Sequence, residues 1–387
     1  MDFIHYFIKK AIHFLLHIFW IFPVNKNRIT LLNDMSLTYG DSMKYLNEYL
    51  QSQQKNKYEI IFPVKEKNLI VGDGCISVKH NTILYYYYLL TSSVVITNAG
   101  GVSYLPFRKR QIAISTWHGG GPYKKTGNAL YSNKWYEKEM RMHRKNTKYI
   151  LSSCKMFTDI EAKAMLFEES ACIPSGMPRN DIFFTRNEII RKKVFEYCKI
   201  SDDSKLVLFA PTFRTNPKDY TDSKKYHATD LDIERLINNL NKRFGNNNWK
   251  IGIRLHPKLR DVELDITNII NLTKYPDIQE LLYTADILIT DYSSLMWDYS
   301  LTKKPCFLYA DDIDDYEREH GFYMPSKKWP YPIARNNNDL EQCILNFDSE
   351  KYVNAVLKHH EESGSYEQGH ACEMTMQLID THYENIK

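Results

Sequence analysis

Several stretches of this sequence end a short apolar run in residues that can move a proton or bind phosphate. Residues 115–125, STWHGGGPYKK, place His118 at the end of a predicted strand, followed by Gly119, further glycines and Lys124. An unperturbed imidazole has a pKa near ~6.5, so a histidine in this position can act as a general base. The glycines let backbone approach a ligand closely. The alternative for this stretch alone is a structural histidine on a loop.

A second histidine has a similar setting. Residues 251–258, IGIRLHPK, end another predicted strand in His256, with Arg254 before it and Lys258 after it. Positive groups at this place can neutralise the charge that develops on a diphosphate leaving group. A lone histidine is usually structural, but two at strand ends, one in each proposed domain, favour a chemical role.

A third strand end carries a hydroxyl and a guanidinium. In residues 207–214, VLFAPTFR, Pro211 ends the predicted strand and leaves Thr212 and Arg214 at the end of the sheet. Arginine can bind a phosphate through two parallel hydrogen bonds. An exposed arginine on an ordinary loop is the equally weighted alternative.

Residues 285–312 contain a strand, a turn and a short helix in succession. The apolar run 287–289 predicts a buried strand, and the turn that follows contains Asp291, Ser293 and Ser294. Serine hydroxyls and a helix N-terminus suit phosphate, whereas the charge of Asp291 opposes it. Asp291 is therefore expected to orient His256 or a lysine. The alternative is a plain capped turn.

Short apolar strands alternate with helical stretches from residue 29 onward, which is typical of βαβ units in a parallel sheet covered on both faces. In such sheets ligands bind at the carboxyl ends of the strands, where all four stretches lie. The predicted strands are 29–32, 58–62, 94–97, 111–116, 149–151, 206–210, 250–255, 287–289 and 306–309. The predicted helices are 41–53, 81–92, 159–167, 188–198, 230–244, 278–283, 295–301, 339–347, 352–360 and 367–383.

The length of 387 residues favours two domains. A polar segment at residues 201–204 suggests the boundary, since the strand pattern restarts after it. The predicted organisation is a membrane-associating helix at 1–24, an acceptor-side domain at 25–200, a donor-binding domain at 201–365, and a C-terminal helix at 366–387 that can pack back on the first domain.

Composition excludes several classes of protein. The net charge of +4 gives no reason to expect nucleic acid as a partner. The seven cysteines form no C-x-x-C pair, which fits reduced thiols in a cytoplasmic compartment and disfavours a disulfide framework or a zinc site. The sequence contains neither a Walker motif nor G-x-G-x-x-G.

The first 24 residues are the most apolar segment. Lys9, His13 and His17 form one polar stripe on a predicted helix that is otherwise rich in phenylalanine, isoleucine and leucine. The uncharged run 11–24 is short for a membrane span, which needs roughly 20 residues. The pattern predicts a helix lying in a membrane interface, with Lys9, Lys10, Lys26 and Arg28 near anionic lipids. The alternative is a helix packed on the protein's own core.

Taken together, these motifs resemble the CDP-glycerol glycerophosphotransferases, enzymes of teichoic acid and capsule polymer synthesis. The resemblance rests on TWHG with a following P-x-K-K, PRND, APTFR, RLHP, ITDYSS with a trailing WDY, and GFY, in the same order from residue 81 to 324. It implies a GT-B-like α/β fold, with two Rossmann-like doubly wound domains facing a cleft and an N-terminal membrane-associating helix. It also implies a CDP-activated polyol as donor, release of CMP, and no metal or other cofactor.

The implied reaction is in-line attack of an acceptor hydroxyl on the polyol-bearing phosphorus. The expected catalytic residues are His118, as general base, and His256, which stabilises the diphosphate. The expected substrate-binding residues are Gly119, Lys124, Thr212, Arg214, Arg254, Asp291, Ser293 and Ser294. The expected partners are a CDP-polyol, a lipid-linked or polymeric acceptor and the membrane surface, at the cytoplasmic face of the cell membrane.

One loop departs from the family pattern. The family reads WHG-T-P before its lysine pair, whereas residues 117–122 read WHGGGP, one residue longer. The identity of the acceptor and of the donor alcohol, glycerol or ribitol, is therefore open. Two other functions are also considered: a GT-B glycosyltransferase that uses a nucleotide sugar, and a non-catalytic membrane-bound assembly component.

Overall fold

The computed structural model describes residues 3–53, 57–66, 68–69, 71–131, 133–212, 231–255 and 269–385. Arg214 and His256, two of the predicted site residues, lie outside these ranges. The chain divides into two compact units, the first made of Met1–Thr185 with Ser363–Lys387 and the second of Arg186–Glu362. The division falls before helix α5 (Glu188–Cys198), whereas the boundary predicted from the sequence lies after that helix.

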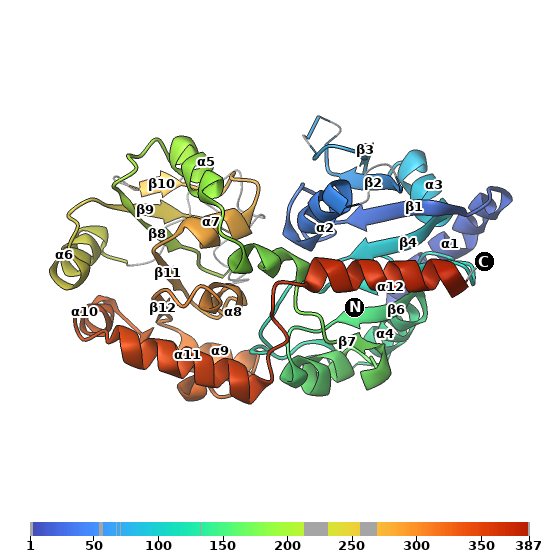
Figure 1. Cartoon of the computed structure of the whole chain (residues 1–387). Helices are drawn as coiled ribbons and strands as arrows, with labels where there is room; N and C mark the ends of the chain where they lie inside the picture. Colours follow the sequence, from blue (N-terminus) through green and yellow to red (C-terminus); the bar gives the residue numbers. More distant parts are fainter. Residues whose placement is uncertain are drawn as a thin grey trace. The chain divides into compact units, whose positions relative to one another are not determined.

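The first unit is built on a seven-stranded parallel sheet in the order β3-β2-β1-β4-β5-β6-β7 (Figure 1). Its order reverses between β1 and β4, and ligands of open α/β sheets bind beside such a switch point. The strands are β1 (Asn25–Leu32), β2 (Glu59–Val64), β3 (Cys75–Lys79), β4 (Ser92–Thr97), β5 (Ile112–Ser115), β6 (Thr147–Leu151) and β7 (Cys172–Ile173).

The central strands of this sheet are buried along their whole length. Every residue of β4 and β5 is buried, because helices cover both faces of a parallel sheet. The longer helices of the unit are α1 (Phe3–Leu16), α2 (Asp41–Gln53), α3 (Ile83–Thr91), α4 (Lys134–Asn146) and α12 (Ala371–Asn385). The short helical segments are η1 (His17–Ile21), η2 (Gly127–Ala129), η3 (Phe157–Ala162), η4 (Glu169–Ala171) and η5 (Pro178–Phe184).

The C-terminal helix α12 packs against η5 and α2. Asp181 on η5 caps α12: its two carboxylate oxygens accept hydrogen bonds from the backbone N–H groups of Ala371 (3.0 Å) and Cys372 (2.8 Å). Just before the helix, Glu367 accepts from the Asn180 side-chain amide at 2.9 Å. The Asn180–Asp181 part of the PRND motif therefore holds the end of the chain to the first unit.

The second unit contains a six-stranded parallel sheet in the order β10-β9-β8-β11-β12-β13, with its switch point between β8 and β11. The strands are β8 (Lys205–Phe209), β9 (Trp249–Ile253), β10 (Ile269–Asn271), β11 (Ile287–Thr290), β12 (Cys306–Tyr309) and β13 (Ile333–Ala334). The helices are α5 (Glu188–Cys198), α6 (Ile233–Phe244), α7 (Ile278–Thr284), α8 (Leu295–Ser300), α9 (Ile313–Glu319), η7 (Ser326–Lys328), α10 (Asn337–Leu345) and α11 (Ser349–Ser363).

The first helix attaches to its own unit through its polar stripe. Lys9 forms an ion pair with Glu139 of α4, and His13 donates from Nδ1 to the Tyr104 carbonyl at 3.0 Å. Further along, Leu16 enters the hydrophobic core. The polar stripe therefore faces the protein together with Ile12, Leu16 and Phe19, and the other large apolar residues are left exposed. The exposed large apolar side chains of this segment are Phe3, Ile4, Phe7, Ile8, Phe14, Leu15, Ile18, Trp20, Ile21 and Phe22.

Two of the cations expected to meet lipid are engaged by the protein. Lys9 pairs with Glu139, and Arg28 is 8% exposed and bound to Glu59 at 2.8 Å. That expectation is wrong for these two residues, because both side chains already have a carboxylate partner. Among the described residues, no helix has the length and apolar character needed to cross a bilayer.

Candidate active site

His118 lies immediately beyond the carboxyl end of β5, beside the switch point of the first sheet. Its Nδ1 lies 3.0 Å from the backbone carbonyl oxygen of Asn98, the residue that follows β4. A carbonyl oxygen only accepts hydrogen bonds, so Nδ1 carries the proton. In the neutral ring the lone pair is then on Nε2. The imidazole is thus held in the tautomer that presents Nε2 as a base.

The backbone before His118 is strained. Trp117 has a φ of 55°, in the left-handed region that bulky residues rarely adopt. The strain persists because the indole is fixed from both sides: its Nε1 donates to Glu161 at 3.0 Å, and its ring lies 4.2 Å from the imidazole of His118. Strained backbone of this kind is concentrated at functional sites.

The charges around His118 oppose one another. Burial lowers the pKa of His118 below its ordinary value, whereas the hydrogen bond to the Asn98 carbonyl and the charge of Asp41 act to raise it. Arg179 and Lys124 add to the lowering. A lowered pKa keeps the imidazole neutral near pH 7, which is the form a general base needs.

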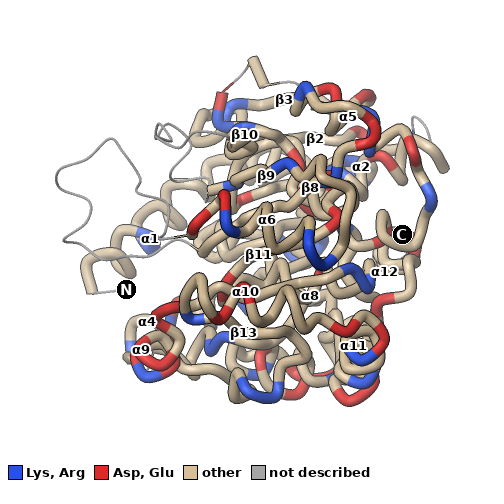
Figure 2. The backbone as a smooth tube through the Cα atoms, turned by 90° about the vertical axis from the view of Figure 1, so that its left-hand side faces the viewer, with Lys and Arg blue, Asp and Glu red and all other residues tan. Residues whose placement is uncertain are grey.

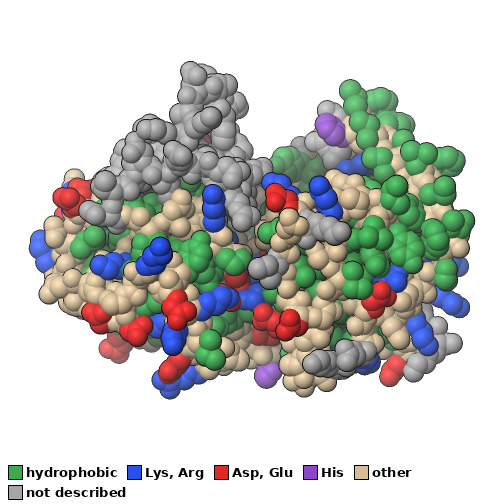
Figure 3. All heavy atoms as spheres, turned by 90° about the horizontal axis from the view of Figure 1, so that it is seen from above, with side chains coloured by type: hydrophobic (Ala, Val, Ile, Leu, Met, Phe, Trp, Pro, Cys, Tyr) green, Lys and Arg blue, Asp and Glu red, His purple; other side chains and the backbone are tan. Residues whose placement is uncertain are grey.

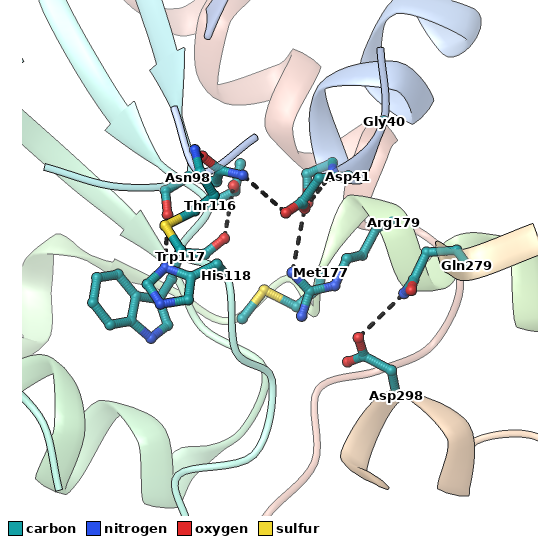
Figure 4. Close-up of polar contacts among 12 residues, drawn as sticks. Gly40, Asp41, Asn98, Thr116, Trp117, His118, Met177, Arg179, Gln279 and Asp298 are labelled. Atoms are coloured by element: carbon teal, nitrogen blue, oxygen red, sulfur yellow. Dashed lines mark hydrogen bonds and ion pairs between the residues drawn. The ribbon is translucent and has the colours of Figure 1, made fainter. Parts of the chain in front are cut away.

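A buried polar network joins the loops around this histidine (Figure 4). The Asn98 amide nitrogen donates to Asn33 after β1 and to Asp41 at the start of α2, both at 2.8 Å. Arg179 of η5 donates to Asp41 at 3.2 Å. Sequence reasoning did not assign Asn98, Asp41 or Arg179 to the site. The available signals were the PRND motif, which contains Arg179, and the position of Asp41 at a predicted helix start.

Glu161 is a second residue that the sequence analysis did not find. It lies on η3, a π-helical segment, and such segments are frequent at functional sites. One of its oxygens accepts from Trp117 and, at 3.3 Å, from the Thr126 hydroxyl. Burial raises the pKa of Glu161 to about 8, and the two hydrogen bonds and the charge of Lys124 act against that rise.

We expect Glu161→Gln to change how the stability of the protein depends on pH. Because the folded-state pKa lies above the ordinary value, the stabilisation from proton binding is complete below about pH 4.5 and is lost as the pH rises towards 8. The wild type should therefore lose about 1 kcal/mol of unfolding free energy per pH unit relative to the variant over this range. Denaturant titrations across this pH range measure the difference. Parallel curves for the two proteins would contradict the prediction.

In the second unit, the ends of β8 and β11 are joined at the switch point. Asp291 accepts hydrogen bonds from the backbone N–H of Thr212, at 2.8 Å, and from its hydroxyl. Asp291 is 2% exposed, whereas Ser293 and Ser294 are partly exposed. Ser294 makes no side-chain cap hydrogen bond to α8, and Ser293 accepts only a long one of 3.4 Å from Leu295. The simple helix-cap interpretation therefore has little support.

Arg254 follows β9 and anchors a neighbouring loop. Its Nη1 donates to the backbone carbonyls of Leu272 (3.3 Å) and Tyr275 (2.5 Å), both of which follow β10. The structure thus gives Arg254 a positioning task in addition to the predicted contact with diphosphate. In the first unit, Gly119 is buried and Lys124 partly exposed on the loop beyond His118.

Residues of two further family-like motifs, WDY and GFY, lie near the DYSS turn. In the WDY segment, Trp297, Asp298 and Tyr299 are fully buried, and Gln279 of α7 donates to Asp298 at 3.2 Å (Figure 4). In the GFY segment, the ring of Phe322 lies 5.7 Å from that of Tyr292. Phe322 therefore contacts the DYSS turn through Tyr292, and the WDY residues form part of helix α8, which follows the turn.

The two parallel sheets, each with a switch point in its strand order, define a two-unit α/β protein of the kind that binds ligands at the carboxyl ends of its strands. More particularly, the chain belongs to the CDP-glycerol:poly(glycerophosphate) glycerophosphotransferase family, which matches residues 14–380. The resemblance drawn from the sequence motifs is confirmed.

Similar proteins in the family are named for two different polyols, glycerol and ribitol. The chain is 30% identical over 359 residues to a teichoic acid poly(glycerol phosphate) polymerase of Staphylococcus epidermidis, covering 88% of this chain and 48% of the relative. It is 28% identical over 336 residues to a teichoic acid ribitol-phosphate primase of Bacillus spizizenii, covering 84% of this chain and 83% of the relative. The chain thus spans about half the length of the first relative and most of the second.

The fold is shared with a solved teichoic acid polymerase. The wall teichoic acid polymerase TagF matches with a TM-score of 0.85 and 25% identity, covering all of this chain and 99% of that chain. A UDP-GlcNAc 2-epimerase of Neisseria meningitidis matches with a TM-score of 0.55 and 12% identity, covering 92% of this chain and 99% of that chain, which is a likeness of fold alone.

Proposed function

We propose that the protein transfers a polyol phosphate, most simply glycerol phosphate, from a CDP-activated donor to a hydroxyl of a lipid-linked or polymeric acceptor in teichoic acid or capsule polymer synthesis, with release of CMP. The observation that carries the proposal is His118, held through Nδ1 with Nε2 as the acceptor of a proton, in a chain of this family. The names of the two relatives above support both glycerol and ribitol as the polyol.

In this proposal the first unit supplies the base. Nε2 of His118 takes the proton of the acceptor hydroxyl as its oxygen attacks the phosphorus in line. Gly119 and Lys124 line the same loop, where the backbone can approach the substrate and a positive charge can face its phosphate. The partial burial that lowers the pKa of His118 also strengthens these electrostatic contacts.

The second unit binds the donor. Ser293 and Ser294 offer hydroxyl donors to the diphosphate, and Asp291 orders the turn by its bonds to Thr212. His256, Arg214 and Arg254 supply positive charge or hydrogen bonds to the leaving CMP. The proposal includes no metal, because cationic and hydroxyl side chains perform the charge stabilisation.

The decisive experiment is turnover by the purified protein with CDP-glycerol, CDP-ribitol and a panel of nucleotide sugars, each with a lipid-linked acceptor. CMP release and a product mass increased by a polyol phosphate are expected, with and without EDTA. Transfer of a sugar instead would establish a glycosyltransferase. The absence of both turnover and nucleotide binding by calorimetry would establish a non-catalytic assembly component.

We expect the double variant Ser293→Ala with Ser294→Ala to bind the CDP-polyol more weakly by roughly 1–3 kcal/mol, the scale of lost hydrogen bonds to a charged group. Acceptor affinity should change little, because these hydroxyls serve the donor. Direct titration with the CDP-polyol measures the change. Unchanged donor affinity would mean that the two serines only begin helix α8 and do not bind the donor. Ser349→Ala, at the start of α11, provides a matched serine control.

We propose that the outward face of α1 and η1 lies on a membrane surface. The face holds large side chains at high exposure, among them Phe14 at 76%, Ile21 at 74% and Leu15 at 69%. The tube drawing shows little charge along α1 (Figure 2), and hydrophobic side chains gather on the side of the molecule where α1 and α3 lie (Figure 3). The exposed Lys10 and Lys26 can meet anionic headgroups.

Membrane contact through the outward face of α1 and η1 holds the proposed enzyme where its acceptor resides. A lipid-linked acceptor resides in the membrane, and a CDP-activated donor is dissolved in the cytoplasm. An enzyme held peripherally at the cytoplasmic face meets the acceptor at high local concentration. The inward polar stripe of α1 supports this orientation, because it fixes the helix to the first unit with its apolar side outward.

A further inference from the structure

Both polar atoms of the Asn98 side chain form hydrogen bonds within the protein. Its amide nitrogen donates to the Asn33 side-chain oxygen and to Asp41, and its own side-chain oxygen accepts from the backbone N–H of Met35 at 3.3 Å. Asn98 is 0% exposed. The backbone carbonyl that receives Nδ1–H of His118 is therefore fixed by contacts to the loop after β1 and the start of α2.

Asp41 holds this arrangement from the α2 side. It has a φ of 54°, a conformation that costs energy for a residue other than glycine, and Ser42 donates its backbone N–H to the Asp41 carboxylate. The loop that leads to Asp41 is shaped by Asn33, whose amide donates to the carbonyls of Thr38 (3.0 Å) and Gly40 (3.3 Å). The position of the Asp41 carboxylate is thus set by β1 and its loop.

Arg179 keeps Asp41 ionised. The side chains are 4% exposed for Arg179 and 18% for Asp41, and they lie 3.2 Å apart. Burial acts to raise the pKa of Asp41, but the charge of Arg179 and the hydrogen bonds from Ser42 and Asn98 outweigh it, so the pKa lies below its ordinary value. A carboxylate charge therefore persists close to His118 through the neutral pH range.

We propose that Asp41 and Arg179 form a positioning pair for His118. Asp41, through Asn98, fixes the Nδ1–H tautomer, and the opposed charges of the pair set the basicity of Nε2. The inference rests on the proposed role of His118 as a base. The charged groups that face the imidazole are Asp41 from α2, Arg179 from η5 and Lys124 from the loop after β5.

The test is a pair of variants with opposite effects. Asp41→Asn removes the negative charge while an amide can still occupy the same place, and it should lower the pKa of His118 by about half a unit to one unit. Arg179→Gln removes the positive charge and should raise that pKa by a similar amount. Imidazole nitrogen chemical shifts of His118 in the full chain, followed through a pH titration, measure both the pKa and the tautomer without any substrate.

Turnover gives the second measurement. The acidic limb of the kcat profile should move to lower pH in Asp41→Asn and to higher pH in Arg179→Gln, and kcat at the plateau should fall about tenfold through looser placement of the ring. Asp380→Asn removes a partly exposed carboxylate of α12 that pairs with Lys57 and accepts from the Tyr58 hydroxyl, and it should change neither quantity.

The results of the nitrogen titration decide whether Asp41 and Arg179 position His118. Shifts of opposite sign in the nitrogen titration support the pair even if the protein proves to catalyse another reaction, because that measurement needs no turnover. Shifts of the same sign, or none, in folded variants would overturn the inference, and so would retention of the Nδ1–H tautomer with an unchanged pKa. If Asp41→Asn does not fold, the direction of the shift in Arg179→Gln decides.

Discussion

Replacing His118 by alanine is expected to lower kcat at least ~100-fold, the scale of one general acid–base group. The variant loses Nε2, the atom that takes the proton of the acceptor hydroxyl. Removal of the ring also releases one hydrogen bond, to the Asn98 carbonyl, and the contact with the indole of Trp117. These contacts orient a partly exposed loop residue, so the thermal unfolding temperature should stay close to that of the wild type.

CMP release under saturating donor and acceptor measures this effect, with donor binding titrated separately. Donor affinity should be nearly unchanged, because the proposed donor site is on the second unit. His370→Ala is the matched control, since His370 is exposed and lies 4.0 Å from Glu373 at the start of α12. Near-normal turnover by His118→Ala would remove His118 from the mechanism.

Replacing Phe14, Leu15, Ile18 and Ile21 by serine is expected to lower binding to anionic vesicles at least ~100-fold. Full burial of one such side chain is worth about 1.5–3 kcal/mol, so even partial insertion of four gives a large loss. Reaction with a lipid-embedded acceptor should slow, and reaction with a short soluble acceptor should be largely spared. Vesicle flotation and parallel turnover assays measure the two effects.

Point substitutions are preferable to deletion of residues 1–24. Leu16 belongs to the core, and Trp20 donates to the Pro106 carbonyl at 2.8 Å, so deletion would also damage the fold. Ile189→Ser with Leu357→Ser is the control, because both residues are exposed apolar side chains of the second unit. Equal flotation of the wild type and the four-serine variant would exclude this face as the membrane contact. High salt should weaken binding only partly, since the apolar contribution is not screened.

The sequence alone predicted the elements whose signals are local. Helices 41–53 and 188–198 and the strand 306–309 have the predicted bounds, because each carries its own apolar pattern and end signals. The parallel α/β class followed from their alternation and is confirmed. The family also followed from the sequence, since several motifs in one order are far more specific than any one of them.

The sequence patterns did not predict the elements that are stabilised mainly by packing or pairing with other elements. The strands β7 and β13 have two residues each, and their place comes from pairing with β6 and β12. Helix α4 was also missed, because its sequence is largely polar and the residues that it buries are Glu139 and His143. It is supported instead by packing of α1, where Phe3 lies 5.0 Å from Trp135, a contact across a long sequence separation.

The sequence by itself determined that His118 ends a strand beside glycines, and that Thr212, Asp291, Ser293 and Ser294 follow strands of a second sheet. Only the tertiary structure decided which residues surround them. Asn98, Asp41 and Arg179 come from three separate segments and meet because parallel strands bring their carboxyl ends to one edge. The outward direction of the apolar side of α1 was decided in the same way: a helical pattern shows two faces, but the partners Glu139 and Tyr104 select which one faces the protein.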